Sequence, residues 1–157
     1  MDHYDKFIEK YENIKQKLYI TAIGITKNHH YAEEALQETA LSAYKNYNSL
    51  KDEELFDTWI TRILMNHCFK TLKKEKTNCN FEDFENTINR YDYFDEEIYL
   101  MDAINSLNLK HREVILLKYF MDFDIKDISK TLRISQGTVK SRLHYAIKEL
   151  RGYYNAI

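Results

Sequence analysis

Apolar residues recur at helical spacing in two separate zones of this chain. In the first zone, from about residue 5 to residue 76, Phe7, Tyr11 and Leu18 fall on one helical face. From about residue 99 to residue 154 the same period returns. Proline is absent and glycine occurs only three times among 157 residues, so turn residues are too few for a sheet-rich fold. The pattern predicts an all-α protein made of two unlike helical domains.

A segment of different composition separates the two zones. Residues 81–97 contain seven acidic side chains and one basic side chain, and their aromatic residues follow no sustained period. We interpret this segment as an acidic linker, with a short helix possible near its end. The predicted domains are residues 1–76 and 99–157, and the predicted linker is residues 77–98. Because the whole chain has a net charge of -2, the two helical zones together carry a positive excess.

The second zone has the pattern of a helix-turn-helix. Its expected helices cover residues 99–107, 110–121, 125–132 and 136–150. Asp124 and Ser135 are suitable N-caps for the last two helices, and residues 133–135 form the turn between them. In a helix-turn-helix the early residues of the second helix enter the major groove of DNA.

The last expected helix divides into an apolar face and a polar face. Val139, Leu143 and Ala146 lie on the apolar face, while small, basic and hydroxyl side chains lie on the other. Five basic residues and one acidic residue occur between Thr131 and Arg151, and such a surplus attracts the phosphate backbone. This favours DNA binding over the alternative, a solvated face of an ordinary helical bundle.

Two segments of this zone resemble a known family. Residues 134–144, ISQGTVKSRLH, resemble the recognition helix of region four of the sigma-seventy family, and residues 107–119, LNLKHREVILLKY, resemble the beginning of that region. The resemblance implies that this domain reads the minus-thirty-five promoter element. The family often has glycine where this chain has Arg133, and proline where it has Ser135. The expected minus-thirty-five contacts are Ser135, Gln136, Gly137, Thr138, Lys140, Ser141, Arg142 and His144.

The first zone contains a helix with an acidic side, expected at residues 30–47. Glu34 and Glu38 form a like-charge pair one turn apart, which is unfavourable in an isolated helix. The helix is therefore either a docking surface for a basic partner or a helix relieved by nearby lysines. Residues 31–44, YAEEALQETALSAY, resemble the region-two helix that grips the clamp helices of the largest polymerase subunit. The expected polymerase contacts are Glu33, Glu34, Gln37 and Glu38.

The next helix, which follows residue 55, ends in a basic stripe that contains Phe69. Basic residues interleaved with an aromatic suit single-stranded DNA, although Phe69 could equally belong to the core and the lysines to the solvent. Residues 56–66, FDTWITRILMN, resemble family regions that melt and read the minus-ten element, which implies that residues 49–55 receive a flipped-out base. The expected minus-ten contacts are Arg62, Asn66, Lys70, Lys73 and Lys74.

The resemblance covers nearly all of the chain except the linker, and implies a sigma factor of the extracytoplasmic-function type. Its partners would be core RNA polymerase, promoter DNA and an inhibitory anti-sigma protein, often anchored in the membrane. The linker would either line a basic polymerase channel or act as a solvated tether. The runner-up is a stand-alone helix-turn-helix repressor or activator that binds duplex DNA without polymerase.

Other functions find little support in the residues. His29, His30, His67 and Cys68 show no nucleophile–base or metal-ligand spacing, so we expect no enzyme, cofactor or metal. An acidic, polar beginning and the absence of a long apolar run predict a cytoplasmic protein. Cys68 and Cys79 are expected to be free thiols.

Overall fold

The computed structural model describes residues 2–74 and 95–156, and within these ranges the regular elements are all helices. The α-helices are α1 (His3–Thr26), α2 (His29–Asn46), α3 (Phe56–Lys74), α5 (Asp95–Ser106), α6 (Leu109–Tyr119), α7 (Ile125–Leu132) and α8 (Gln136–Ala156). Two short 3-10 turns, η1 (Tyr47–Ser49) and η2 (Glu53–Leu55), join α2 to α3. The all-α prediction is confirmed. Most of the expected linker lies outside the described residues, and α5 begins inside its last part.

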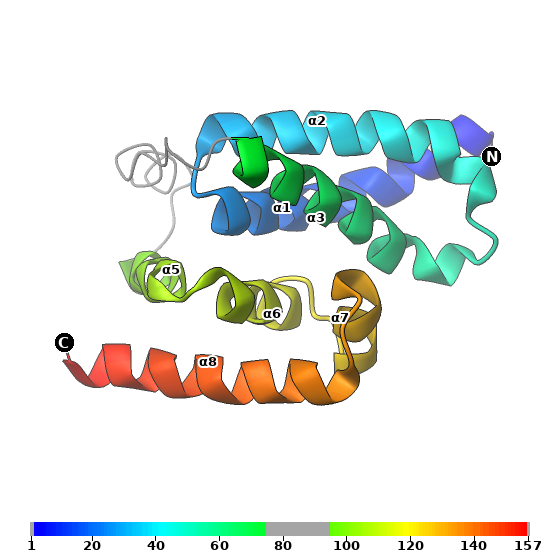
Figure 1. Ribbon diagram of the computed structural model, residues 1–157. Coiled ribbons are helices and arrows are strands. Elements are labelled where there is room, and N and C mark those ends of the chain that lie inside the picture. Colours follow the sequence, from blue (N-terminus) through cyan, green and yellow to red (C-terminus); the bar gives the residue numbers. More distant parts are fainter. Residues whose placement is uncertain (1, 75–94, 157) are drawn as a thin grey trace.

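Helices α1, α2 and α3 pack together as an N-terminal module, the upper layer in Figure 1. The buried face of α2 is lined with small residues, Ala32, Ala35 and Ala43, which allow α1 and α3 to approach closely. Asn28 caps α2 by accepting a hydrogen bond from the Tyr31 backbone N–H at 2.9 Å.

An aromatic cluster fixes the place where the two 3-10 turns connect α2 to α3. The Phe7 ring lies 5.4 Å from the Tyr47 ring and 6.0 Å from the Phe56 ring, and both contacts are edge-on. All three side chains are buried. Tyr44 contacts the Phe7 ring at the edge of this cluster and stays 46% exposed.

Helices α5 to α8 form a C-terminal module, the lower layer in Figure 1, in which α7 and α8 build the predicted helix-turn-helix. Val139, Leu143 and Ala146 are buried on α8, as their spacing predicted. Leu100 on α5 is 37% exposed, while Met101 and Ile104 on the same helix are buried. Helix α8 also continues to Ala156, about two turns beyond its predicted end.

Both predicted N-caps of the helix-turn-helix are present. The Asp124 carboxylate accepts a hydrogen bond from the Asp127 backbone N–H at 2.7 Å, and Asp127 accepts one from the Asp124 N–H at 3.3 Å. This is a capping box. The Ser135 hydroxyl oxygen accepts a hydrogen bond from the Thr138 N–H at 3.1 Å, which satisfies one of the donors left free at the start of α8.

The two modules lie against each other. Helix α1 contacts α5 and α6, and α3 contacts α7. The buried apolar side chains of the two modules belong to one continuous cluster. Figure 1 shows the resulting arrangement, with α2 on the outer face of the upper layer and α8 on the outer face of the lower one.

Cys68 on α3 is fully buried and free, and burial raises the pKa of its thiol to about 12. Within residues 2–74 and 95–156 we find no helix long and apolar enough to cross a membrane.

Candidate nucleic-acid interface

The beginning of α8 presents the residues predicted to contact duplex DNA. Ser135, Gln136, Gly137, Lys140, Ser141 and His144 are exposed, and Thr138 and Arg142 are half-buried. The buried residues of α8 lie on the opposite side and hold the helix against α6 and α7. The structure therefore brings the predicted set together at the beginning of α8 and in the turn before it.

A groove of about 530 Å³ separates this end of α8 from the beginning of α6. Its lining combines basic and hydroxyl side chains from α8 and the turn before it with Lys110 from α6. Sequence reasoning missed the contribution of α6, because helical periodicity identifies a face but not the helix that it meets. The residues lining the groove are Asn108, Lys110, His111, Ser135, Gly137, Thr138, Ser141, Arg142 and Tyr145.

A buried carboxyl group lies beneath this basic end. Glu113 on α6 is only 7% exposed, and burial raises its pKa to about 7, although Arg142, Arg112 and Lys110 act in the opposite direction. The group is thus partly protonated near neutral pH, because burial disfavours its charged form more than the three cations favour it.

The turn between α7 and α8 closes without glycine. Arg133 adopts the left-handed conformation, with φ 57° and ψ 46°. The Ile134 backbone N–H donates to the Ser129 carbonyl at 3.2 Å, and the Ser129 hydroxyl donates back to the Ile134 carbonyl at 2.5 Å. These reciprocal hydrogen bonds hold the tight geometry that glycine would adopt with less strain.

The basic stripe of α3 is accessible along most of its length. Asn66, Lys70, Lys73 and Lys74 are exposed. Arg62 is half-buried, and its Nε is enclosed without a hydrogen-bond partner among the described residues. Phe69 is partly buried and packs against the core, which favours the alternative in which it is a core residue and not a DNA contact.

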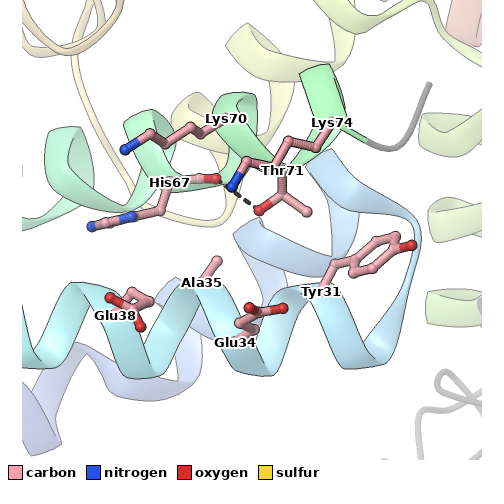
Figure 2. A pocket seen from close by; sticks show the side chains of 8 residues that line it. All are labelled: Tyr31, Glu34, Ala35, Glu38, His67, Lys70, Thr71 and Lys74. Carbon is pink, nitrogen blue, oxygen red and sulfur yellow. Dashed lines mark hydrogen bonds between the residues drawn. The ribbon is translucent and has the colours of Figure 1, made fainter.

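The expected polymerase contacts on α2 divide between two sides of the helix. Glu34 and Glu38 line a pocket of about 310 Å³ between α2 and α3, where they face His67, Lys70 and Lys74 (Figure 2). The pKa of His67 is lowered, mainly by burial and also by Lys70, although Glu38 acts in the opposite direction. Two lysines thus line the same pocket as the two glutamates, which favours the alternative in which nearby lysines relieve the like-charge pair.

Glu33 and Gln37 lie on the other side of α2, in a groove between α1 and α2. This groove has a volume of about 910 Å³ and is lined by Glu12 and Lys15 as well as by apolar side chains such as Leu41. Glu33 is also paired with His29, with 3.1 Å between its Oε1 and the His29 Nε2.

Exposed apolar residues extend this groove toward the beginning of α1. Tyr4 is 50% exposed, Leu41 is 56% exposed, and Ile8 and Tyr44 are also accessible. The centroids of the Tyr4 and Tyr44 rings are 5.5 Å apart in an edge-on contact, which places the beginning of α1 beside the end of α2. A contiguous apolar surface beside charged residues is typical of a protein-binding site. The sequence analysis missed this surface, because the spacing of apolar residues along one helix does not show which of them a neighbouring helix covers.

The described residues contain no group of three or more His, Cys, Asp or Glu side chains that could hold a metal ion. The arrangement instead offers two accessible basic helix faces, on α3 and α8, and an apolar groove with charged borders between α1 and α2.

Comparison with known proteins agrees with this arrangement. Residues 11–77 match the family model "Sigma-70 region 2", and residues 97–150 match "Sigma-70, region 4". The chain is 29% identical, over 164 residues, to the ECF RNA polymerase sigma factor SigW of Bacillus subtilis, an alignment that covers 94% of this chain and 88% of SigW. It is 27% identical to the RNA polymerase sigma factor SigV of the same organism, covering 87% of this chain and 84% of SigV.

Solved structures share the fold over nearly the whole chain. The sigma factor RpoE of Bartonella quintana, solved in complex with the anti-sigma factor NepR, has a TM-score of 0.79 and 21% identity, covering 96% of this chain and 97% of RpoE. CnrH, solved in complex with the cytosolic domain of CnrY, has a TM-score of 0.76 and 18% identity, covering 98% of this chain and 90% of CnrH.

The chain belongs to the sigma-70 family, as an extracytoplasmic-function RNA polymerase sigma factor with regions 2 and 4. It directs RNA polymerase to promoters through these two regions and is not an enzyme. The N-terminal module contains region 2, and the C-terminal module contains region 4.

Proposed function

We propose a division of labour among the three surfaces. The end of α3 holds the melted strand of the minus-ten element, and the beginning of α8 reads the minus-thirty-five element in duplex DNA. The groove between α1 and α2, with Glu33 and Gln37, binds core polymerase, and Glu34 and Glu38 support that contact from the α3 side. The observation that carries the proposal is the exposed row of Lys140, Ser141 and His144 opposite the buried face of α8.

The proposal also assigns a role to each domain, a location to the protein and a set of partners. Residues 1–76 act on core polymerase and the minus-ten element, residues 99–157 act on the minus-thirty-five element, and residues 77–98 connect them. The chain works in the cytoplasm, where polymerase is found. The two similar structures were each solved with a partner, the anti-sigma factor NepR for RpoE and the cytosolic domain of CnrY for CnrH, which supports an anti-sigma partner for this chain. A membrane anchor would hold such a partner at the bilayer.

Run-off transcription tests the function as a whole. Purified chain is added to core polymerase that lacks its own specificity subunit, with genomic fragments as templates. Discrete transcripts that require the chain are expected, while the chain alone should not shift the same duplex fragments in a gel. A tight gel shift by the chain alone, without transcripts, would establish the repressor or activator alternative.

Lys140→Ala tests the role of α8 within that function. Loss of one contact in the major groove should weaken promoter binding by about tenfold. Core association should stay unchanged, because the α1–α2 groove is untouched. The matched control is Lys148→Ala, which removes the same charge about two turns further along α8. Loss of core binding in Lys140→Ala would show that the division of labour is wrong.

A further inference from the structure

A chain of hydrogen bonds crosses the α1–α2 groove and ends on Glu33. The Tyr19 hydroxyl is hydrogen-bonded to the Nδ1 of His29, and the Nε2 of His29 lies 3.1 Å from the Oε1 of Glu33. Tyr19 belongs to α1, whereas His29 and Glu33 lie one turn apart in the first part of α2. Tyr19 and Glu33 both line the groove. The hydrogen bonds therefore connect a side chain of α1 to a carboxylate of α2.

The chemistry of the three groups sets the direction of these hydrogen bonds. An ionised carboxylate can only accept, so the Nε2 of His29 carries the hydrogen that points to Glu33. In the neutral imidazole the other nitrogen, Nδ1, is then an acceptor, and the Tyr19 hydroxyl donates to it. Tyr19 thus stabilises the tautomer of His29 that donates to Glu33.

Burial decreases along this chain from Tyr19 to Glu33. Tyr19 is 7% exposed, whereas the side chains of His29 and Glu33 are 21% and 52% exposed. The His29 ring also meets the Tyr19 ring edge-on, with 5.9 Å between the ring centroids. A buried residue therefore anchors, through His29, a half-exposed carboxylate that would otherwise sample several rotamers.

Glu33 differs in this respect from the other acidic residues predicted to contact polymerase. Glu34 and Glu38 face the lysines of α3 in the pocket on the other side of α2 (Figure 2). Glu33 is directed to the α1–α2 groove, and the hydrogen bond from His29 uses only one of its two oxygens. The second oxygen, Oε2, can still accept from a basic side chain of a partner.

We propose that Tyr19 and His29 are positioning residues, which hold the Glu33 carboxylate in the orientation that core polymerase binds. This inference rests on the proposed function, in which Glu33 contacts core polymerase. A long side chain that is ordered before binding loses less entropy when the complex forms. Tyr19 and His29 thus raise the affinity through Glu33 and not through contacts of their own.

Calorimetric titration of the full-length chain into core polymerase that lacks its own specificity subunit measures this effect. Tyr19→Phe keeps the buried ring and removes only the hydroxyl, so the Kd should rise about two- to tenfold. His29→Leu removes both hydrogen bonds and should weaken binding at least as much. His29→Gln should recover part of that loss, because its amide can accept from Tyr19 and donate to Glu33.

The matched control is Tyr47→Phe. It also removes a buried tyrosine hydroxyl that donates to a glutamate, at 3.3 Å from the Glu53 Oε1, but Tyr47 does not line the α1–α2 groove. Its Kd for core polymerase should equal that of the wild type. A loss as large as that of Tyr19→Phe would show that any buried hydroxyl of this module affects binding through the fold, and would overturn the proposal.

A double-mutant cycle shows whether Tyr19 acts through Glu33. Glu33→Ala alone should weaken core binding by about tenfold. In the Glu33→Ala background, Tyr19→Phe should change the Kd by less than about 1.5-fold, because the carboxylate that it positions is gone. An equal loss of affinity from Tyr19→Phe in both backgrounds would mean that Tyr19 acts independently of Glu33, which contradicts the positioning role.

Failure of the inference and failure of the proposed function give different results. If Glu33→Ala weakens core binding while Tyr19→Phe and His29→Leu bind as the wild type does, the positioning role is wrong and the contact of Glu33 stands. If Glu33→Ala itself binds as the wild type does, the contact proposed for Glu33 is wrong, and the positioning role is overturned with it.

Discussion

Arg133 has a backbone conformation that is costly for residues with a side chain, because its φ is 57°. The left-handed region costs such residues about 1–2 kcal/mol, while glycine adopts it freely but loses about 0.5–1 kcal/mol through its greater freedom in the unfolded chain. Arg133→Gly should therefore stabilise the protein by about 0.5–1 kcal/mol. Urea unfolding measures the change. Arg133→Ala removes the charge but keeps the strain, so stabilisation by alanine as well would show that charge, not backbone conformation, is responsible.

Glu113 should make stability depend on pH. Its pKa is about 7 in the folded protein, where burial is the main cause, and its ordinary value is 4.5. A raised pKa means that the folded state binds the proton more tightly, so the stabilisation is complete below about pH 4.5 and is lost as pH rises to about 7. The loss is at most about 3 kcal/mol, at 1.36 kcal/mol for each pH unit of difference.

Glu113→Gln tests this dependence, because glutamine keeps the shape of the side chain and stays neutral. Urea unfolding across the same pH range should show a smaller decline for the variant than for the wild type, and greater stability for the variant above pH 7. The matched control is Glu54→Gln at an exposed position of η2. Parallel pH profiles for wild type and Glu113→Gln would contradict the raised pKa.

At the scale of a single helix, Ser135 has two roles that can be separated. It caps α8 through the Thr138 N–H, and it lies in the groove beside the predicted DNA-reading residues. Ser135→Ala should cost about 1 kcal/mol of stability through loss of the cap, and should also weaken DNA binding. Ser135→Asp restores a cap oxygen but repels phosphate, so it should recover stability while DNA binding by the holoenzyme stays weak.

Thermal unfolding and a promoter-binding assay check the two Ser135 variants together. Recovery of both stability and DNA binding in Ser135→Asp would show that Ser135 acts only as a cap. Loss of both would show that an acidic cap cannot replace the hydroxyl at this turn.

Helices and caps could be predicted from the sequence because their causes are local. Asp124 and Ser135 act on backbone groups three residues away, and Val139 and Leu143 follow the helical period, so their positions in the chain determine their roles. The surroundings of the acidic residues on α2, in contrast, depend on the position of another helix. Periodicity placed Glu33 and Glu34 on one polar side, but helix α3 meets only the Glu34 side, and no spacing within α2 contains that information.

At the scale of the whole molecule, the contact between the two modules could not be predicted from the sequence either, because spacing within one helix does not identify the helix that it meets. Gly24 on α1 lies against Leu116 on α6, where a Cβ atom on Gly24 would come within 2.6 Å of a Leu116 Cδ atom. The two residues are separated by most of the chain, and each has an ordinary explanation within its own helix. A glycine inside a helix is unfavourable by about 1 kcal/mol relative to alanine, which signals a close approach but not its partner. Only the three-dimensional arrangement shows that the partner is in the other module.

The joined core predicts how the whole molecule unfolds. Because the buried apolar residues of the two modules form one cluster, the free chain should unfold in a single cooperative transition. Trp59, the one tryptophan, packs partly buried in the N-terminal module, while far-ultraviolet circular dichroism reports the helices of both modules. In urea, the fluorescence and dichroism curves of the wild type should therefore coincide.

Gly24→Leu should separate the two curves, because each module then unfolds with its own stability once the contact with Leu116 is disrupted. Gly152→Leu should leave them coincident, since no neighbour surrounds that position. Curves that already differ in the wild type would mean that the modules are independent. Curves that remain coincident in Gly24→Leu, with the midpoint of the wild type, would mean that the α1–α6 contact contributes nothing to the cooperativity of the fold.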